Sequence, residues 1–179
     1  MSEEPTQYPD TPVEPVTLER IGEIFASENL EYRLEEQPVS EEETVQILRT
    51  GFSNVAIAMQ VRDDVLVADS VWRGNVPSSE GPTLLTVLNQ WNQQHFAPTL
   101  RFFESAENNL AVSGVREINI AHGLSRNQIG AFVMSTLDSM LQSFAFVEEH
   151  YPQLVTWEEH NHDSVSYTHL RAHETDSYL

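Results

Sequence analysis

Five residues are the candidates for binding a small ligand or a protein partner: Trp72, Arg73, Asn89, Trp91 and Asn92. Trp72 and Arg73 close a stretch of alternating apolar residues, whereas the other three lie in one segment with helical spacing. Because asparagine is an indifferent helix former, we expect Asn89 and Asn92 to hydrogen-bond to neighbouring loops. Trp91 is expected in the core, and the alternative is a ligand pocket near Trp72, Trp91 and Asn92.

The sequence contains none of the motifs that usually carry catalysis. It has no phosphate-binding loop, no dinucleotide fingerprint, no Gly-x-Ser-x-Gly elbow and no zinc-protease histidine pair. The histidines that precede the tail fall at or near the ends of expected elements, where surface or capping roles are usual. They are His95, His122 and His150. We therefore predict no catalytic residue, no cofactor and no enzymatic activity.

Two acidic clusters and one pair of histidines are the only candidates for a metal site. The consecutive carboxylates of residues 41–43 lack the glycine and the fixed geometry of a calcium loop. The carboxylates of residues 63–69 have no second type of ligand near them in the sequence. His160 and His162 form an isolated pair on a polar tail. We predict that none of these groups holds a metal.

The charge balance restricts the partners that the chain can bind. The 179 residues include 28 acidic and 9 basic side chains, a net charge of −19, and every basic residue is arginine. Such a surface repels phosphate backbones and anionic membranes, so we expect neither nucleic acid nor a membrane as a partner. A basic protein partner is one interpretation of this acidity, and a role in solubility is the other.

The apolar pattern predicts neither a membrane span nor a secretory signal. No run approaches the roughly 20 apolar residues that a membrane-spanning helix needs. The N-terminus lacks a basic stretch followed by an apolar one. We therefore expect the protein in the cytoplasm. The absence of cysteine excludes disulfides and thiolate metal sites.

The longest periodic segment runs from Ser125 to Tyr151 and predicts an amphipathic helix. Ser125 and Gln128 have the spacing of a capping box, and Pro152 prevents further helix. Apolar residues at three- and four-residue intervals form one stripe. They are Ile129, Phe132, Val133, Leu137, Met140, Leu141, Phe144 and Val147. The stripe requires a broad apolar surface opposite it.

The rest of the chain supplies that surface as strands. Helical spacing predicts two further helices, one after Thr17 and one between Pro82 and Pro98. Alternation predicts three or four strands between these helices and two strands after the second, with a β-bulge at Gly114. The candidate strands are 31–36, 44–51, 55–62, 65–71, 100–103 and 110–120. The fold class is α+β.

Composition divides the chain into three parts. Residues 1–16 are acidic and rich in proline, which predicts disorder. Residues 17–155 form the folded domain, and residues 156–179 form a polar, unstructured tail. Within that tail, residues 165–175 match one translation frame of a transposase adapter used in sequencing libraries. We interpret residues 165–179 as read-through of that adapter and leave them out of the fold prediction.

The order of several short motifs resembles the YbjN domain family, especially its actinobacterial members. The matching positions are Trp72-Arg73-Gly74, Asn89-x-Trp91-Asn92, Pro98, Gly123-Leu124-Ser125, Phe144, Glu148 and Pro152. The resemblance covers about residues 16–154. It implies a fold similar to type III secretion chaperones, α-β-β-β-α-β-β-α, in which helices pack on one face of a twisted antiparallel sheet. It also implies a dimer and a role in bacterial sensory transduction, and it brings no catalytic residue with it.

Two hypotheses of function follow from these observations. The first is a non-enzymatic protein-binding module, regulatory or chaperone-like, that forms a homodimer and binds a partner along a sheet face or a sheet edge. The second is a sensor of a small ligand that uses the pocket near Trp72, Trp91 and Asn92. The sequence leaves open which face or edge of the sheet would bind.

Overall fold

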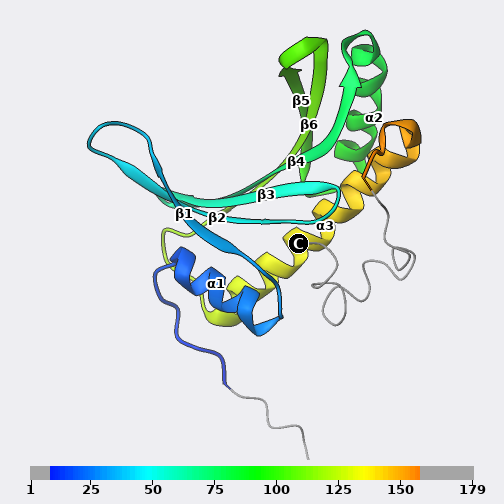
Figure 1. The fold of residues 1–179 in the computed structure, drawn as a ribbon. Coiled ribbons are helices and arrows are strands. Elements are labelled where there is room, and N and C mark those ends of the chain that lie inside the picture. Colours follow the sequence, from blue (N-terminus) through cyan, green and yellow to red (C-terminus); the bar gives the residue numbers. More distant parts are fainter. Residues whose placement is uncertain (1–8, 158–179) are drawn as a thin grey trace, which may run out of the picture.

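The computed structural model describes residues 9–157, which form three helices and six strands (Figure 1). The structure has four strands before the second helix, which corrects the order α-β-β-β-α-β-β-α implied by the resemblance by one additional strand. The elements are α1 (Leu18–Ser27), β1 (Arg33–Pro38), β2 (Thr44–Gly51), β3 (Val55–Arg62), β4 (Val65–Pro77), α2 (Gly81–Gln94), β5 (Thr99–Ser105), β6 (Asn109–Asn119) and α3 (Arg126–His150). Short 3-10 turns are η1 (Ser78–Glu80), η2 (Ala106–Asn108) and η3 (Pro152–Leu154). The predicted α+β class is confirmed.

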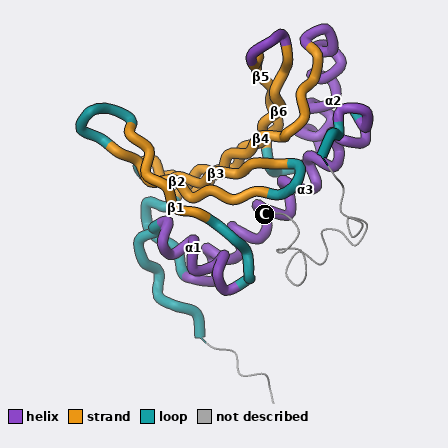
Figure 2. Tube along the Cα trace, in the orientation of Figure 1, coloured by secondary structure: helices purple, strands orange, loops and turns teal. Residues whose placement is uncertain are grey.

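The six strands form one antiparallel sheet in the order β1-β2-β3-β4-β6-β5. The sheet is strongly bent, and all three helices lie on the same side of it (Figure 1). The tube drawn in Figure 2 shows that none of the helices of residues 9–157 covers the opposite side. We call this uncovered side the open face. Because side chains alternate along a strand, each strand contributes every second residue to it.

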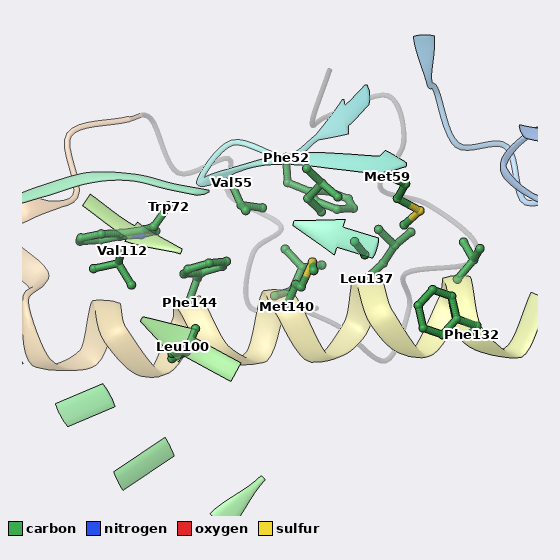
Figure 3. Close-up of a cluster of buried hydrophobic side chains, with 14 of the residues drawn as sticks. Phe52, Val55, Met59, Trp72, Leu100, Val112, Phe132, Leu137, Met140 and Phe144 are labelled. Carbon is green, nitrogen blue, oxygen red and sulfur yellow. The ribbon is translucent and has the colours of Figure 1, made fainter. Parts of the chain in front are cut away.

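Helix α3 is the central element of the core. Ser125 accepts a hydrogen bond from the Gln128 amide, and the Gln128 side chain accepts one from the Ser125 amide, as the predicted capping box requires. All eight apolar residues of the predicted stripe are buried. Figure 3 shows Leu137, Met140 and Phe144 of this stripe facing side chains of the sheet.

Length and composition alone would allow α3 to cross a membrane. Half of its most apolar window is buried inside the protein, however. The core helix of a folded domain passes the same test, so its length and hydropathy are weak evidence for a membrane span. The sheet already occupies the apolar face that a bilayer would need to contact.

Residues 9–16 are bonded to the domain, which corrects the predicted disorder of residues 1–16 for this part. Thr11 Oγ1 accepts a hydrogen bond from the Arg126 amide at 2.8 Å, and Asp10 Oδ1 accepts one from the Asn127 amide at 3.0 Å. A hydrogen bond with the Ser125 side chain is the main cause that lowers the pKa of Asp10. The segment therefore satisfies amides at the start of α3 that have no partner within the helix. Residues 1–8 and 158–179, including the predicted tail, lie outside the described residues.

The irregularity in the sheet lies in β4 and not at Gly114, where the sequence predicted it. Gly114 pairs in register with Ser70 on one side and Leu100 on the other. Between Val71 and Asn75, β4 advances four residues while β6 advances two. Such a bulge bends the strand that contains it. The bend of β4 is visible in Figure 1.

Candidate functional site

The bulge in β4 consists of Trp72, Arg73 and Gly74, and it sends the first two side chains to opposite faces. Trp72 is 1% exposed and packs edge to face on Trp157, with ring centroids 5.7 Å apart. A Cβ atom at Gly74 would overlap the Trp72 indole ring. Glycine therefore lets the indole lie flat over the backbone of its own strand. Arg73 lies on the open face, where its side chain is accessible.

The candidate residues of α2 fasten this helix to β5. Asn92 Oδ1 accepts a hydrogen bond from the Leu100 amide and Asn92 Nδ2 donates one to the Leu100 carbonyl, both at 2.8 Å. Trp91 is buried, and its Nε1 donates to the carbonyl of Pro98 at 3.0 Å. The predicted hydrogen bonds are thus confirmed for Asn92. Asn89 is exposed and forms no side-chain hydrogen bond within residues 9–157.

The open face carries most of the positive charge of an otherwise acidic protein. Strand register and alternation place five of the eight arginines of residues 9–157 on it. The same strands place three carboxylates there, so the face has a surplus of two positive charges. The arginines are Arg33, Arg49, Arg62, Arg73 and Arg101, and the acids are Glu35, Asp69 and Glu117.

Two of these acids already bind arginines of the same face. Glu35 forms ion pairs with Arg49 at 2.7 Å and with Arg33 at 3.3 Å. Asp69 lies 3.8 Å from Arg101. These pairs are at least one-third exposed, and such pairs contribute about 0–1 kcal/mol to stability. Their main effect is to hold the guanidinium groups in place.

Arg73 has no such carboxylate within the described part of the chain. Its Nε donates to the carbonyl of Phe52 at 3.1 Å, and no ion pair involves its guanidinium among residues 9–157. A Cβ atom at Gly51 would lie 3.2 Å from Arg73 Nη2, so the absence of a side chain at Gly51 leaves room for the guanidinium.

Arg73 lines a cavity of about 630 Å³, which we call the arginine pocket. Its lining residues come from the C-terminal end of α1, from the loop between α1 and β1, from β1 and β2, and from the bulge in β4. They are Ala26, Leu30, Glu31, Tyr32, Arg33, Arg49, Thr50, Gly51 and Arg73. Of the predicted binding residues, only Arg73 belongs to this pocket. Arg33 and Arg49 were not among the predicted binding residues, although both alternate with the apolar residues Leu34 and Leu48 and could have been placed on the opposite face.

A second cavity of about 380 Å³ lies between α2 and η3. Tyr151 lines it, and the buried hydroxyl of this residue has no hydrogen-bond partner among residues 9–157. Burial, followed by the nearby charge of Glu80, raises the pKa of Tyr151. Neither cavity is lined by Trp72, Trp91 or Asn92. The pocket proposed near those three residues has no counterpart in either cavity because their polar atoms face the core or the backbone.

The part of the chain that the structure describes contains no cluster of metal-binding side chains. No group of three or more histidines, aspartates or glutamates lies close enough there to hold an ion. The histidine pair of the tail, His160 and His162, falls outside the described residues.

The fold and the site define a class of α+β domains in which helices cover one face of a bent antiparallel sheet. Within residues 9–157, no helix covers the other face. The profile of the YbjN family, described as "Putative bacterial sensory transduction regulator", matches residues 17–149. This chain therefore belongs to the YbjN family, as its motifs predicted. At the level of the family it is a regulatory module, and the family description names a regulator and not an enzyme.

A solved structure shows the same fold. The chain is similar to "Crystal structure of YbjN, a putative transcription regulator from E. coli", with a TM-score of 0.60 and 13% sequence identity. The match covers 83% of this chain and 100% of that chain. At this identity the likeness establishes the fold alone. No curated protein matches the sequence.

Proposed function

We propose that this chain is a non-enzymatic regulatory module that binds a segment of a partner protein on its open face. The observation that carries the proposal is the contrast between the two faces of one sheet. The helices bury most of the large apolar side chains of one face, while the other keeps exposed apolar side chains beside accessible arginines. An apolar surface of this kind typically marks an interaction site.

The exposed apolar residues of the open face lie on three different strands. Val45 on β2, Val71 on β4 and Phe103 on β5 are 37%, 38% and 48% exposed. Ala56 and Ala58 of β3 lie between β2 and β4 in the sheet. Because their side chains are small, the surface of the open face is shallow there. A partner segment that crosses the strands would cover these residues and remove their apolar area from water.

The edges of the sheet are less suited to a partner strand than the face. The edge strand β1 carries Arg33, Glu35 and Glu36, and the edge strand β5 carries Arg101 and Glu104. Charged side chains on an edge strand disfavour pairing with another chain. We therefore propose contact through side chains of the face and not through backbone pairing at an edge.

The charge of the open face suggests the chemistry of the partner. The net charge of the chain is −19 and would attract a basic protein to the rest of the surface. The open face has the opposite sign, which favours a neutral or acidic segment there. A homodimer remains part of the proposal, because a second copy could occupy the same surface.

A site-specific crosslinking experiment tests the proposal. The photoreactive amino acid p-benzoylphenylalanine replaces Val71 on the open face or, as the matched control, Leu85, which is 51% exposed on α2. We expect illumination in the native host to give one discrete adduct from position 71 and none from position 85. Mass spectrometry identifies the adduct as a partner or as a second copy. Equal adducts from both positions, or none from position 71, would contradict the proposal.

The sensor hypothesis has less support. Trp72 and Trp91 are buried in the core, and Asn92 already hydrogen-bonds to the backbone of β5. Ligand binding near these three side chains would require the core to open. The geometry therefore favours the protein-binding module.

A further inference from the structure

We propose that the arginine pocket binds a side-chain carboxylate of the partner segment, so that the open face selects acidic sequences. This inference rests on the proposed function, because the pocket shares three arginines with the open face, although it also includes residues of α1 on the covered side. Arg33, Arg49 and Arg73 line the pocket and also lie on that face. A segment lying on the face can therefore reach the pocket without leaving the sheet.

The charges inside the pocket leave one guanidinium without an acidic partner. Three arginines and one acidic residue, Glu31, line the pocket, and Glu35 lies outside its lining. Glu35 is shared between Arg33 and Arg49. Among residues 9–157, Arg73 forms no ion pair, so it is the cation with capacity for a carboxylate from outside.

The position of Arg73 suits a carboxylate. The hydrogen bond from its Nε to the Phe52 carbonyl fixes one edge of the guanidinium and leaves both Nη groups as donors. Two Nη donors form a planar fork that matches the two oxygens of a carboxylate. The bulge supports this arrangement, because Trp72 and Gly74 hold the backbone on either side.

The other walls of the pocket suit a peptide. Ala26, Leu30 and Tyr32 present apolar surface from α1 and from the loop that joins it to β1. The volume of about 630 Å³ exceeds that of one carboxylate and leaves space for neighbouring side chains of a segment. The net charge of −19 disfavours polyanions such as nucleic acids, whereas a single carboxylate carries only one charge.

Fluorescence anisotropy with defined peptides tests the inference on the purified full chain. The probe is a fluorescein-labelled octapeptide of alternating Glu and Val, and the comparison peptides replace Glu with Gln or Lys. We expect the Glu peptide to bind and the other two to bind at least about tenfold more weakly, since a charge-assisted hydrogen bond is lost. Equal binding of the Gln peptide would overturn the inference.

Variants locate the bound carboxylate. Arg73→Ala should weaken binding of the Glu peptide by about tenfold to a hundredfold, and Arg73→Lys should recover only part of it. Arg62→Ala is the matched control, because Arg62 is an exposed arginine of the same face that does not line the pocket. Arg33→Ala, at a side chain that is 74% exposed, gives a second pocket variant if Arg73→Ala folds poorly. Equal losses of affinity in the pocket variants and in Arg62→Ala would show a general electrostatic attraction of the peptide to the open face and would contradict the proposal.

Two further results distinguish failure of this inference from failure of the proposed function. Displacement of the Glu peptide by inorganic phosphate or succinate at concentrations near those of the peptide would show a small-anion site and overturn the inference. Loss of selectivity for Glu, with the crosslink from position 71 intact, would remove the inference and leave the proposed function standing. Loss of both would remove both.

Discussion

The helix-covered face and the open face belong to the same six strands but carry different side chains. On β4 the alternation is direct: Trp72 and Val76 are buried under the helices, whereas Val71 and Arg73 are accessible on the other side. The covered face stabilises the fold through burial of apolar area, at about 25 cal/mol per Å². The open face buries Ile47 and Val67 but leaves Val71 and Arg73 accessible, so these accessible side chains can serve recognition. We therefore expect substitutions on the covered face to change stability and those on the open face to change binding.

The largest expected effect is at the centre of the covered face. Phe144 is fully buried on α3 beneath the sheet. Phe144→Ala should lower the free energy of unfolding by about 3–5 kcal/mol, because it removes apolar contacts and leaves a cavity. Urea denaturation followed by circular dichroism measures this change. A loss below about 1 kcal/mol would show that α3 is not the core helix.

The sharpest comparison uses one substitution at two positions of the same strand. Val76→Ala on the covered face should cost about 2 kcal/mol of unfolding free energy, because it deletes two fully buried methyl groups. Val71→Ala on the open face should change it by less than about 0.5 kcal/mol. Denaturant midpoints of the two variants, measured side by side, test this. Similar midpoints would mean that the open face is covered by another part of the protein.

An added methyl group should lower the stability when it is placed in the bulge of β4 and raise it when it is placed in the core helix α3. Gly74→Ala places a Cβ atom into the Trp72 ring, and overpacking of this kind costs about 1–3 kcal/mol. Gly130→Ala in α3 meets only Ile24 Cδ1 at 3.7 Å, and alanine is the better helix former by up to about 1 kcal/mol. Thermal melts should therefore show a lower Tm for the first variant and a higher Tm for the second. A Gly74→Ala protein with unchanged Tm and tryptophan fluorescence would contradict the close contact between position 74 and the Trp72 ring.

The two asparagines of α2 test whether these side chains stabilise the fold or bind a partner. Asn92→Ala leaves the amide and carbonyl of the buried Leu100 without their partner, at a cost of about 1–3 kcal/mol. Asn89→Ala changes an exposed side chain and should stay within about 0.5 kcal/mol of the parent. Chemical denaturation of both variants provides the measurement. If Asn92→Ala were neutral in stability but abolished partner binding, Asn92 would belong to the site after all.

The smallest expected effect lies at the margin of the covered layer. Burial raises the pKa of Asp138 on α3 above its ordinary value of 3.8, so the folded state holds the proton more tightly than the unfolded state. The contribution of that proton to stability is complete below pH 3.8 and is lost as the pH rises through the folded pKa. Asp138→Asn should therefore raise the stability at pH 7, by less than about 0.5 kcal/mol, and have no effect below pH 3.8. Melting temperatures from pH 3.5 to pH 7 check this; a gain that is constant with pH would exclude ionisation as the cause.

The elements that the sequence predicted best are those with a local cause. The capping box of Ser125 and Gln128 and the stripe of α3 use residues a few positions apart, and both are confirmed. The α+β class followed from alternation, which needs no knowledge of strand order. Side-chain hydrogen bonds were predicted for both asparagines of α2, and Asn92 forms them, whereas Asn89 is exposed and forms none within residues 9–157.

The predictions that needed correction depend on distant parts of the chain. The bulge lies in β4 because β4 and β6 pair out of step there, and a glycine in β6 could not reveal that. Residues 9–16 are ordered because they bond to the start of α3, more than a hundred positions away. The arginine pocket was missed because its residues come from α1, β1, β2 and β4.

The sequence by itself determined the helices, the strands and the face that each strand buries, because periodicity and capping act within a few residues. Only the tertiary structure decided which strands are neighbours, where β4 bulges and which arginines share a pocket. The physical reason is that register between strands depends on pairing across the whole sheet. The resulting bend places Arg73 beside Gly51, and no local pattern encodes that contact.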